Sequence, residues 1–127
     1  MPFVRVDVLD SRTPEELTAI GDGVHRALVE AIGIPPQDRF QVLNRHPQSG
    51  LVFDRHYLGI ARTDGVVFIQ ITMSLGRSLE QKKNLFQGIV RHLSEKPGVR
   101  TEDVFVNLVE VVKENWSFGN GIAQYAS

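Results

Sequence analysis

Hydrophobic and polar residues alternate over residues 3–9, close to the start of the chain. One face of this extended segment carries Val4, Val6 and Val8, and the other carries Phe3, Arg5, Asp7 and Leu9. A period of two is typical of a half-buried β-strand. A more apolar segment with the same start, Phe68 in place of Phe3, lies further along the chain. We therefore expect a strand at both places.

A pattern with a period of about 3.6 residues follows each of these strands. Its apolar positions are Leu17, Ile20, Val24, Leu28 and Ala31 in the first segment, and Leu85, Ile89 and Leu93 in the second. One apolar stripe at this spacing predicts an amphipathic helix that covers a sheet. Thr13 and Ser78 precede the helices, and Glu16 and Gln81 follow three residues later. This capping-box pattern predicts that the helices begin directly after Thr13 and Ser78, with Pro14 at the first helical position of the first helix.

A glycine ends each predicted helix, and a further strand follows it. Gly33 and Gly98 stand at the two helix C-termini, and Pro35-Pro36 prevents the first helix from continuing. Extended, apolar-rich segments resume at residues 40–43 and 104–109. Each half of the chain therefore predicts the order strand, helix, strand.

The two halves align with each other at a constant offset of about 65 residues. The identical pairs are Phe3 and Phe68, Arg12 and Arg77, Glu15 and Glu80, Gly23 and Gly88, Arg26 and Arg91, Leu28 and Leu93, Gly33 and Gly98, Asp38 and Asp103, and Phe40 and Phe105. The helix-start signals coincide as well. We interpret the chain as one domain over residues 1–127 that contains an internal repeat, residues 2–43 and residues 67–109.

Two such units predict an α+β fold. A crossover helix makes the strands of each unit parallel, and the two units can join into a four-stranded sheet with both helices on one face. The other face then stays uncovered. We expect the valines of the first strand on that face, and we therefore expect the chain to form an oligomer. The linker from residue 44 to residue 65 is predicted as a loop with a short hairpin, formed by residues 51–53 and 58–61.

Composition narrows the function classes. The 127 residues are 42% hydrophobic and 23% charged with a formal net charge of −1, which favours neither disorder nor nucleic-acid binding. No cysteine is present, so thiolate nucleophiles, disulfides and thiolate metal sites are excluded. Arg5 and Asp7 interrupt any signal-peptide core, and no stretch approaches the ~20 apolar residues of a membrane span. We expect a cytoplasmic protein without a membrane or nucleic-acid partner.

Few side chains offer chemistry. The four histidines, His25, His46, His56 and His92, are never at metal-ligand spacing, and no glycine-rich phosphate loop occurs. We expect no metal and no cofactor. His25 and His92 are interpreted as surface or interface residues on the helices, and His46 as a loop histidine without a partner.

Pro2 is distinguished by its position, because it follows the initiator Met directly and begins a strand. Methionine aminopeptidases remove Met before a small residue, proline included, so the mature chain is expected to start with a secondary amine. Such an amine titrates near 8, and burial or nearby cations shift it toward the neutral form. It can act as a general acid or base, or as a nucleophile toward a carbonyl.

Several motifs together resemble the tautomerase superfamily, and within it the malonate semialdehyde decarboxylase group. The resemblance covers nearly the whole chain. Its motifs are Met1-Pro2 before the first strand, Arg12-Thr13, Ile34-Pro35-Pro36-Gln37-Asp38-Arg39-Phe40-Gln41, Gly76-Arg77-Ser78 with Glu80-Gln81-Lys82, and Glu114-Asn115-Trp116-Ser117-Phe118-Gly119. Members of this superfamily use the N-terminal proline in catalysis, and their two-unit chains assemble as trimers.

The resemblance implies roles for particular residues. Pro2 would be the catalytic amine, protonated in the decarboxylase and placed to polarise the substrate carbonyl. Asp38 would assist Pro2 or orient a water molecule; the alternative is a turn residue before a strand, as its repeat partner Asp103 illustrates. Arg77 would bind the substrate carboxylate, for which the planar guanidinium is suited. Arg12, its repeat equivalent, is interpreted as a surface residue at the helix start.

The chain departs from the group at one position. Leu75-Gly76-Arg77 stands where the decarboxylase has Arg-Pro-Arg, so one of two carboxylate-binding arginines is replaced by Leu75, which we include among the substrate-binding positions. Trp116 and Phe118 would form an apolar wall that excludes water.

We therefore predict a cofactor-independent enzyme that acts on a small oxo acid and resembles malonate semialdehyde decarboxylase, assembled as a homotrimer. Keto-enol tautomerisation and hydration of an unsaturated acid use the same groups and stay open as reactions. A non-catalytic strand-helix-strand binding module stays open as another class.

Overall fold

The computed structural model describes residues 1–126. Two helices, four strands and four short 3-10 turns follow one another along the chain. They are β1 (Pro2–Leu9), α1 (Pro14–Ile32), β2 (Gln41–His46), η1 (Gln48–Gly50), η2 (Tyr57–Gly59), β3 (Val67–Ser74), α2 (Leu79–Glu95), η3 (Thr101–Asp103), β4 (Val104–Val111) and η4 (Lys113–Asn115).

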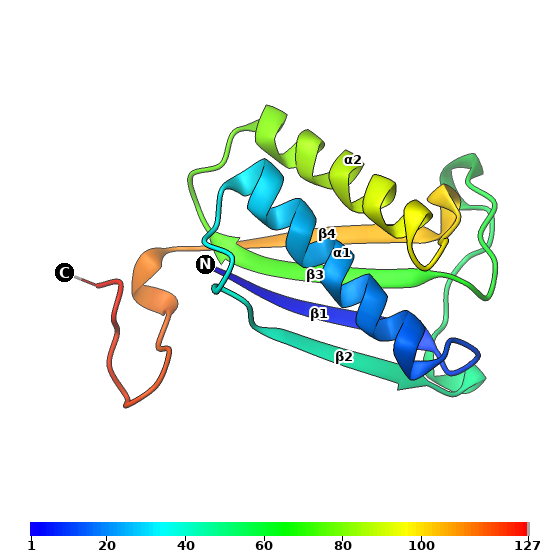
Figure 1. Cartoon of the computed structure of the whole chain (residues 1–127), viewed down its shortest axis with the longest axis horizontal. Coiled ribbons are helices and arrows are strands. Elements are labelled where there is room, and N and C mark those ends of the chain that lie inside the picture. Colours follow the sequence, from blue (N-terminus) through cyan, green and yellow to red (C-terminus); the bar gives the residue numbers. More distant parts are fainter. Residues whose placement is uncertain (127) are drawn as a thin grey trace.

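The strands form one sheet in the order β2-β1-β3-β4, with both helices on one face (Figure 1). β1 pairs parallel with β2, and β3 pairs parallel with β4, because a helix connects the members of each pair. The two central strands, β1 and β3, are antiparallel. The predicted α+β architecture is thus confirmed.

The core lies between the helices and the sheet. Val4, Val6 and Val8 point into it, where Leu17 and Ile20 of α1 belong to the same buried cluster. The assignment of these valines to the uncovered face was therefore wrong. An apolar helix stripe packs on the more apolar face of a half-buried sheet, and in β1 that face carries the valines.

The uncovered face of the sheet carries aromatic side chains among polar ones. Phe68 lies edge-on to Phe105, with ring centroids 5.2 Å apart, and Phe53 of the linker lies edge-on to Phe68 at 6.0 Å. Phe3 and Phe105 are exposed in the single chain. The uncovered apolar surface therefore includes these phenylalanines and not the valines of β1.

Both capping boxes are present. Thr13 accepts from the backbone of Glu16 and Ser78 accepts from that of Gln81, and each N3 side chain bonds back to its cap. Gly33 ends α1 with a φ of 76°, the left-handed conformation that glycine adopts without strain. The predicted helix starts are confirmed to the residue.

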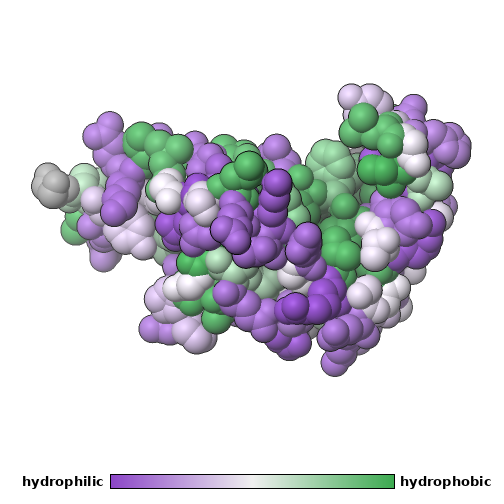
Figure 2. Space-filling model, turned by 90° about the horizontal axis from the view of Figure 1, so that it is seen from above, coloured by the Kyte–Doolittle hydropathy of each residue, from purple (hydrophilic) through white to green (hydrophobic). Residues whose placement is uncertain are grey.

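The linker contains no hairpin, so that prediction was wrong. Its two regular segments are the 3-10 turns η1 and η2. The guanidinium of Arg62 donates to the carbonyl oxygens of Asp54, Tyr57 and Ile60, and this holds the backbone in a closed loop rather than in paired strands. Val52 of the linker is 90% exposed. Hydrophobic side chains gather at the end of the molecule where the linker lies (Figure 2).

Two histidines and Arg12 lie in surroundings that differ from those predicted. His46 ends β2, which runs three residues further than expected, and its Nε2 lies 2.6 Å from Asp7 Oδ1. His92, predicted as a surface or interface residue, is buried within the chain, with Nε2 2.7 Å from Glu30 Oε1. The guanidinium of Arg12 is largely buried, not on the surface. Polar strand residues and non-local ion pairs of this kind leave no local periodic signal.

No helix among residues 1–126 has the length and apolar character needed to cross a membrane.

Candidate active site

One end of the sheet collects the start of β1 and the ends of β3 and β4. Pro2 pairs with Met73, which directly precedes the last residue of β3. Because β2 is parallel to β1, the segment before β2, which contains Asp38, reaches the same end. The C-terminal segment leaves β4 there too (Figure 1). The topology thus brings four separate segments to one place.

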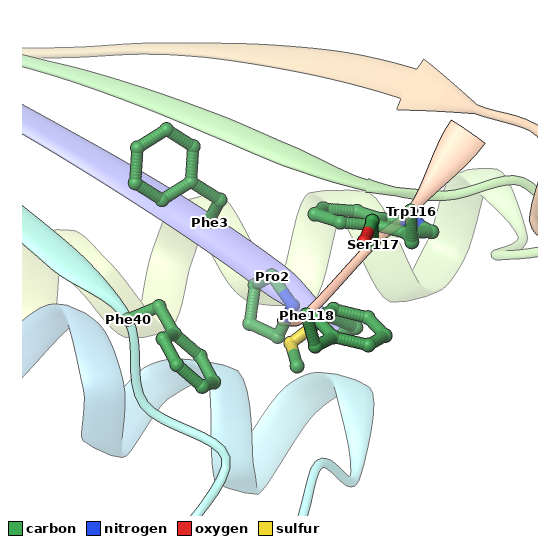
Figure 3. A pocket seen from close by; sticks show the side chains of 7 residues that line it. Pro2, Phe3, Phe40, Trp116, Ser117 and Phe118 are labelled. Carbon is green, nitrogen blue, oxygen red and sulfur yellow. The ribbon is translucent and has the colours of Figure 1, made fainter. Parts of the chain in front are cut away.

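A pocket of about 260 Å³ opens at this end (Figure 3). Its walls are mainly apolar, and its lining residues are Met1, Pro2, Phe3, Phe40, Trp116, Ser117 and Phe118. Pro2 belongs to β1, Phe40 to the segment before β2, and the last three residues to the C-terminal segment. Pro2, Trp116 and Phe118, three of the predicted site residues, therefore share one cavity.

The amino terminus lies beside Asp38. In this structure the terminal nitrogen belongs to Met1, so it stands in for the amine that Pro2 would carry after removal of Met1. It is 3.9 Å from Asp38 Oδ2, and the side chain of Asp38 is only 12% exposed. The other oxygen, Oδ1, is buried without a hydrogen-bond partner. A carboxylate with a free buried oxygen beside an amine is able to bind a further donor.

Burial and three nearby charges act on the pKa of this amine. Burial lowers its pKa most strongly, and the carboxylate of Asp38 opposes that effect. The positive charges of Arg77 and Lys113 lower the pKa further, so the net shift is downward from the ordinary value. The amine is therefore closer to neutrality at physiological pH than an exposed one.

Arg77 lies in the short turn between β3 and α2. Gly76, with a φ of 121°, lets the chain turn from Ser74 to the helix cap Ser78 within three residues. The Nε atom of Arg77 is buried without a hydrogen-bond partner. Arg77 does not line the pocket itself, but its charge acts on the terminal amine. A guanidinium whose Nε lacks a partner is suited to bind an anionic group of a ligand.

Leu75, by contrast, is not among the pocket-lining residues. Its side chain is 52% exposed, and its backbone N–H donates to the carbonyl of Val111 at 2.9 Å. The structure thus gathers Pro2, Asp38, Trp116 and Phe118, sets Arg77 at their edge, and leaves Leu75 outside.

The repeat places an equivalent set, Arg12 and Asp103, at the opposite end of the sheet. There the linker supplies the partners: Arg12 Nη2 donates to the carbonyl of Gly65 at 2.6 Å. Asp103, 1% exposed, accepts from the backbone N–H of Thr63 at 2.8 Å and from its hydroxyl at 2.6 Å. The carboxylate of Asp103 is therefore satisfied within the chain, whereas one oxygen of Asp38 is not.

Sequence reasoning did not find every residue of the pocket. Phe3 and Phe40 line it, although the alternation pattern and the strand prediction gave them only structural places. Lys113 was not singled out either, because a lysine in a polar stretch carries no signal of what it faces. Its position three residues before the Trp-Ser-Phe-Gly motif was the one available indication.

Known proteins share both the sequence and the fold. Two family models described as tautomerase enzymes match residues 38–119 and 2–60. The probable tautomerase YusQ of Bacillus subtilis (strain 168) is 38% identical over 124 residues, which are 98% of this chain and 98% of YusQ.

Solved structures give the same result. FG41 malonate semialdehyde decarboxylase, inhibited by 3-bromopropiolate, is 40% identical with a TM-score of 0.91 over 97% of this chain and 93% of its own. A fused 4-OT that forms a symmetric trimer shares the fold at 22% identity, with a TM-score of 0.78 over 97% of each chain. The family matches, the full-length likeness to YusQ and the architecture agree: this chain is an enzyme of the tautomerase superfamily.

Proposed function

We propose that the protein uses Pro2 as a catalytic amine on a small oxo acid, in the manner of malonate semialdehyde decarboxylase and without a cofactor. One observation carries the proposal: the amino terminus lies 3.9 Å from a largely buried carboxylate, Asp38, at an apolar pocket. The 40% identity to a malonate semialdehyde decarboxylase supports the substrate class.

Removal of Met1 makes the nitrogen of Pro2 the terminal amine. Pro2 lines the pocket, so its nitrogen is available to a ligand there once the preceding peptide bond is gone. In its protonated form, which the carboxylate of Asp38 favours against burial, this amine donates a hydrogen bond to the aldehyde oxygen of the substrate. The bond between the carboxylate carbon and the adjacent carbon then breaks, and its electron pair passes into the polarised carbonyl system. Carbon dioxide leaves, and the carbon of the resulting enolate takes the proton of the Pro2 amine to give acetaldehyde, after which water returns a proton to the amine.

Arg77 holds the carboxylate in this proposal. The Nε atom of its guanidinium is buried and has no hydrogen-bond partner, so it is able to donate to a bound anion. An anion bound there is oriented by a planar, two-pronged donor, which suits a carboxylate better than an ammonium does. The side chains of Trp116 and Phe118 exclude water from the pocket, and this strengthens the electrostatic interactions inside.

A keto-enol tautomerase or a hydratase is the second candidate. The observation that favours it is the lowered pKa of the terminal amine, because a neutral amine is a base that removes a proton next to a carbonyl. The relative YusQ is named as a probable tautomerase, which supports the same reading. The decarboxylase and the tautomerase would thus differ in the charge that Pro2 carries at working pH.

We further propose a homotrimer. The sheet face opposite the helices exposes Phe3 and Phe105, and a fused 4-OT of the same fold is a symmetric trimer. Burying phenylalanines on such a face favours association by about 25 cal/mol for each Å² of apolar surface. A location in the cytoplasm stays a prediction, which fractionation of the source cells would test.

A panel of oxo acids tests the function. Carbon dioxide release from malonate semialdehyde supports the decarboxylase, whereas ketonisation of a dienol or of phenylenolpyruvate without gas release supports the tautomerase. Arg77→Gln should raise KM at least tenfold for the oxo acid that the enzyme turns over. The weak binding of the corresponding amide, which lacks the carboxylate, should stay unchanged. Turnover of no acid in the panel, together with retention of Met1 by intact mass, would leave the chain as a binding module.

A further inference from the structure

A buried hydroxyl group ends strand β3. Ser74 is only 5% exposed, and the equivalent position of the first repeat is Leu9, which is also buried. The fold therefore accepts an apolar side chain at this position. A hydroxyl in the same surroundings loses its hydration and is stable only with a hydrogen-bond partner. The identity of this hydrogen-bond partner therefore indicates the role of Ser74.

That partner is the indole of Trp116, a wall of the proposed active site. Nε1 of Trp116 donates to Ser74 Oγ at 3.0 Å. The indole in turn stacks on Phe118, with ring centroids 5.5 Å apart and ring planes 17° apart (Figure 3). Because both rings line the pocket, the hydroxyl of Ser74 is bonded directly to the pocket wall.

The other contacts of the C-terminal segment that carries Trp116 and Phe118 are mainly within that segment. Gln124 accepts from the backbone N–H of Phe118 and donates to the carbonyl of Gly119, both at 2.9 Å. Tyr125 packs edge-on to Phe118, with centroids 4.8 Å apart. These contacts close the segment on itself, beyond the end of the sheet (Figure 1). The bond from Trp116 to Ser74 connects this closed unit to the rigid end of β3.

We propose that Ser74 is a positioning residue: its hydroxyl fixes the plane of the Trp116 indole, and so sets the aromatic wall that presses the oxo acid against Pro2. This role rests on the proposed function, because it requires that an oxo acid binds in the pocket. A single neutral hydrogen bond corresponds to a factor of about three to ten in an equilibrium. We expect the effect mainly in KM, because the wall contacts the substrate and does not exchange protons with it.

Ser74→Thr and Ser74→Val are a matched pair, nearly equal in volume and different in the hydroxyl. The valine variant should raise KM about three- to tenfold with kcat changed less than twofold, and the threonine variant should stay close to wild type. Ser94→Ala is the control, because Ser94 bonds only a backbone carbonyl at the far end of α2. Equal KM values for the threonine and valine variants would overturn the proposal.

Trp116 is the single tryptophan of the chain, so its fluorescence tests the contact without any substrate. Ser74→Val should increase the acrylamide quenching constant at least twofold, and Ser74→Thr should not. Trp116→Phe removes the donor and keeps a stacking ring; combined with Ser74→Val, it should raise KM no more than the larger single change. If quenching differs between the valine and threonine variants but no oxo acid is turned over, the contact between Ser74 and Trp116 is supported and the proposed function is refuted. If the KM effects of Ser74→Val and Trp116→Phe are additive, the positioning role is refuted.

Discussion

Asp38 and Asp103 occupy equivalent positions of the repeat, and their replacement by alanine should have opposite effects. Asp103→Ala is expected to destabilise the protein strongly and leave the site intact. Asp38→Ala is expected to leave stability nearly unchanged and to impair activity. The reason is that the linker satisfies the carboxylate of Asp103, whereas one oxygen of Asp38 has no partner.

The magnitude for Asp103 follows from its contacts. Its buried carboxylate accepts two short hydrogen bonds from Thr63, and Arg100 Nη1 lies 3.5 Å away. Hydrogen bonds to a charged group contribute about 1.5–3 kcal/mol each, and alanine avoids part of the desolvation penalty, which leaves a net loss of about 3 kcal/mol. With an unfolding entropy of about 2.1 cal/mol/K per residue, the chain of 127 residues should lose about 11 °C in Tm.

The side chain of Asp38 contributes far less to the free energy of unfolding. Its nearest charged partner is the amine at 3.9 Å, so Asp38→Ala should cost at most about 1 kcal/mol, or less than about 4 °C. Thermal unfolding is followed by circular dichroism at matched protein concentration, because association makes Tm depend on concentration. An equal loss of Tm in both variants, or a loss below 4 °C for Asp103→Ala, would refute the reasoning.

Two further matched pairs give predictions with opposite signs. A Cβ at Gly23 would lie 2.8 Å from Leu93 Cδ2, whereas one at Gly88 meets nothing closer than 3.5 Å. Urea unfolding should therefore show Gly88→Ala stabilised by up to about 1 kcal/mol and Gly23→Ala destabilised; stabilisation of both would contradict the packing. Lys113→Gln should raise the pKa of the terminal amine and Asp38→Ala should lower it, since the two charges act on it oppositely. In the pH profile of kcat/KM, the limb that reports the amine should shift to higher pH for Lys113→Gln and to lower pH for Asp38→Ala. A shift of both variants in the same direction would refute the electrostatic account.

Local signals predicted the elements of the fold well. The capping residues Thr13 and Ser78 define the helix starts because the bonds that form there lie within four residues of sequence. The linker was predicted wrongly because its shape depends on Arg62, which binds three carbonyl oxygens along the loop. Alternation revealed two faces of β1, and the helices cover the purely apolar one with Val4, Val6 and Val8; the prediction was wrong because it assigned that face to an oligomer contact.

The site was harder to derive from residues alone. Pro2 is detectable because it follows Met1 directly, and the family resemblance added Asp38, Arg77 and the Trp-Ser-Phe-Gly segment. The Ser74 bond to Trp116 joins residues 42 positions apart, and no pattern in the sequence predicts it. Only the repeat, with leucine in place of serine, marks the position as unusual.

Pro2→Ala provides the most direct test of the central claim. Alanine is small enough for Met1 still to be removed, so the variant carries a primary amine at the place of the secondary one, and intact mass verifies the processing. The proline ring fixes the orientation of its nitrogen, whereas the primary amine of the variant rotates freely and loses that alignment. A well-aligned general acid or base typically contributes a factor of about 10²–10⁴. Turnover of the best oxo acid should fall at least about 100-fold at unchanged Tm. Turnover equal to that of the wild type would contradict the assignment of Pro2 as the catalytic amine.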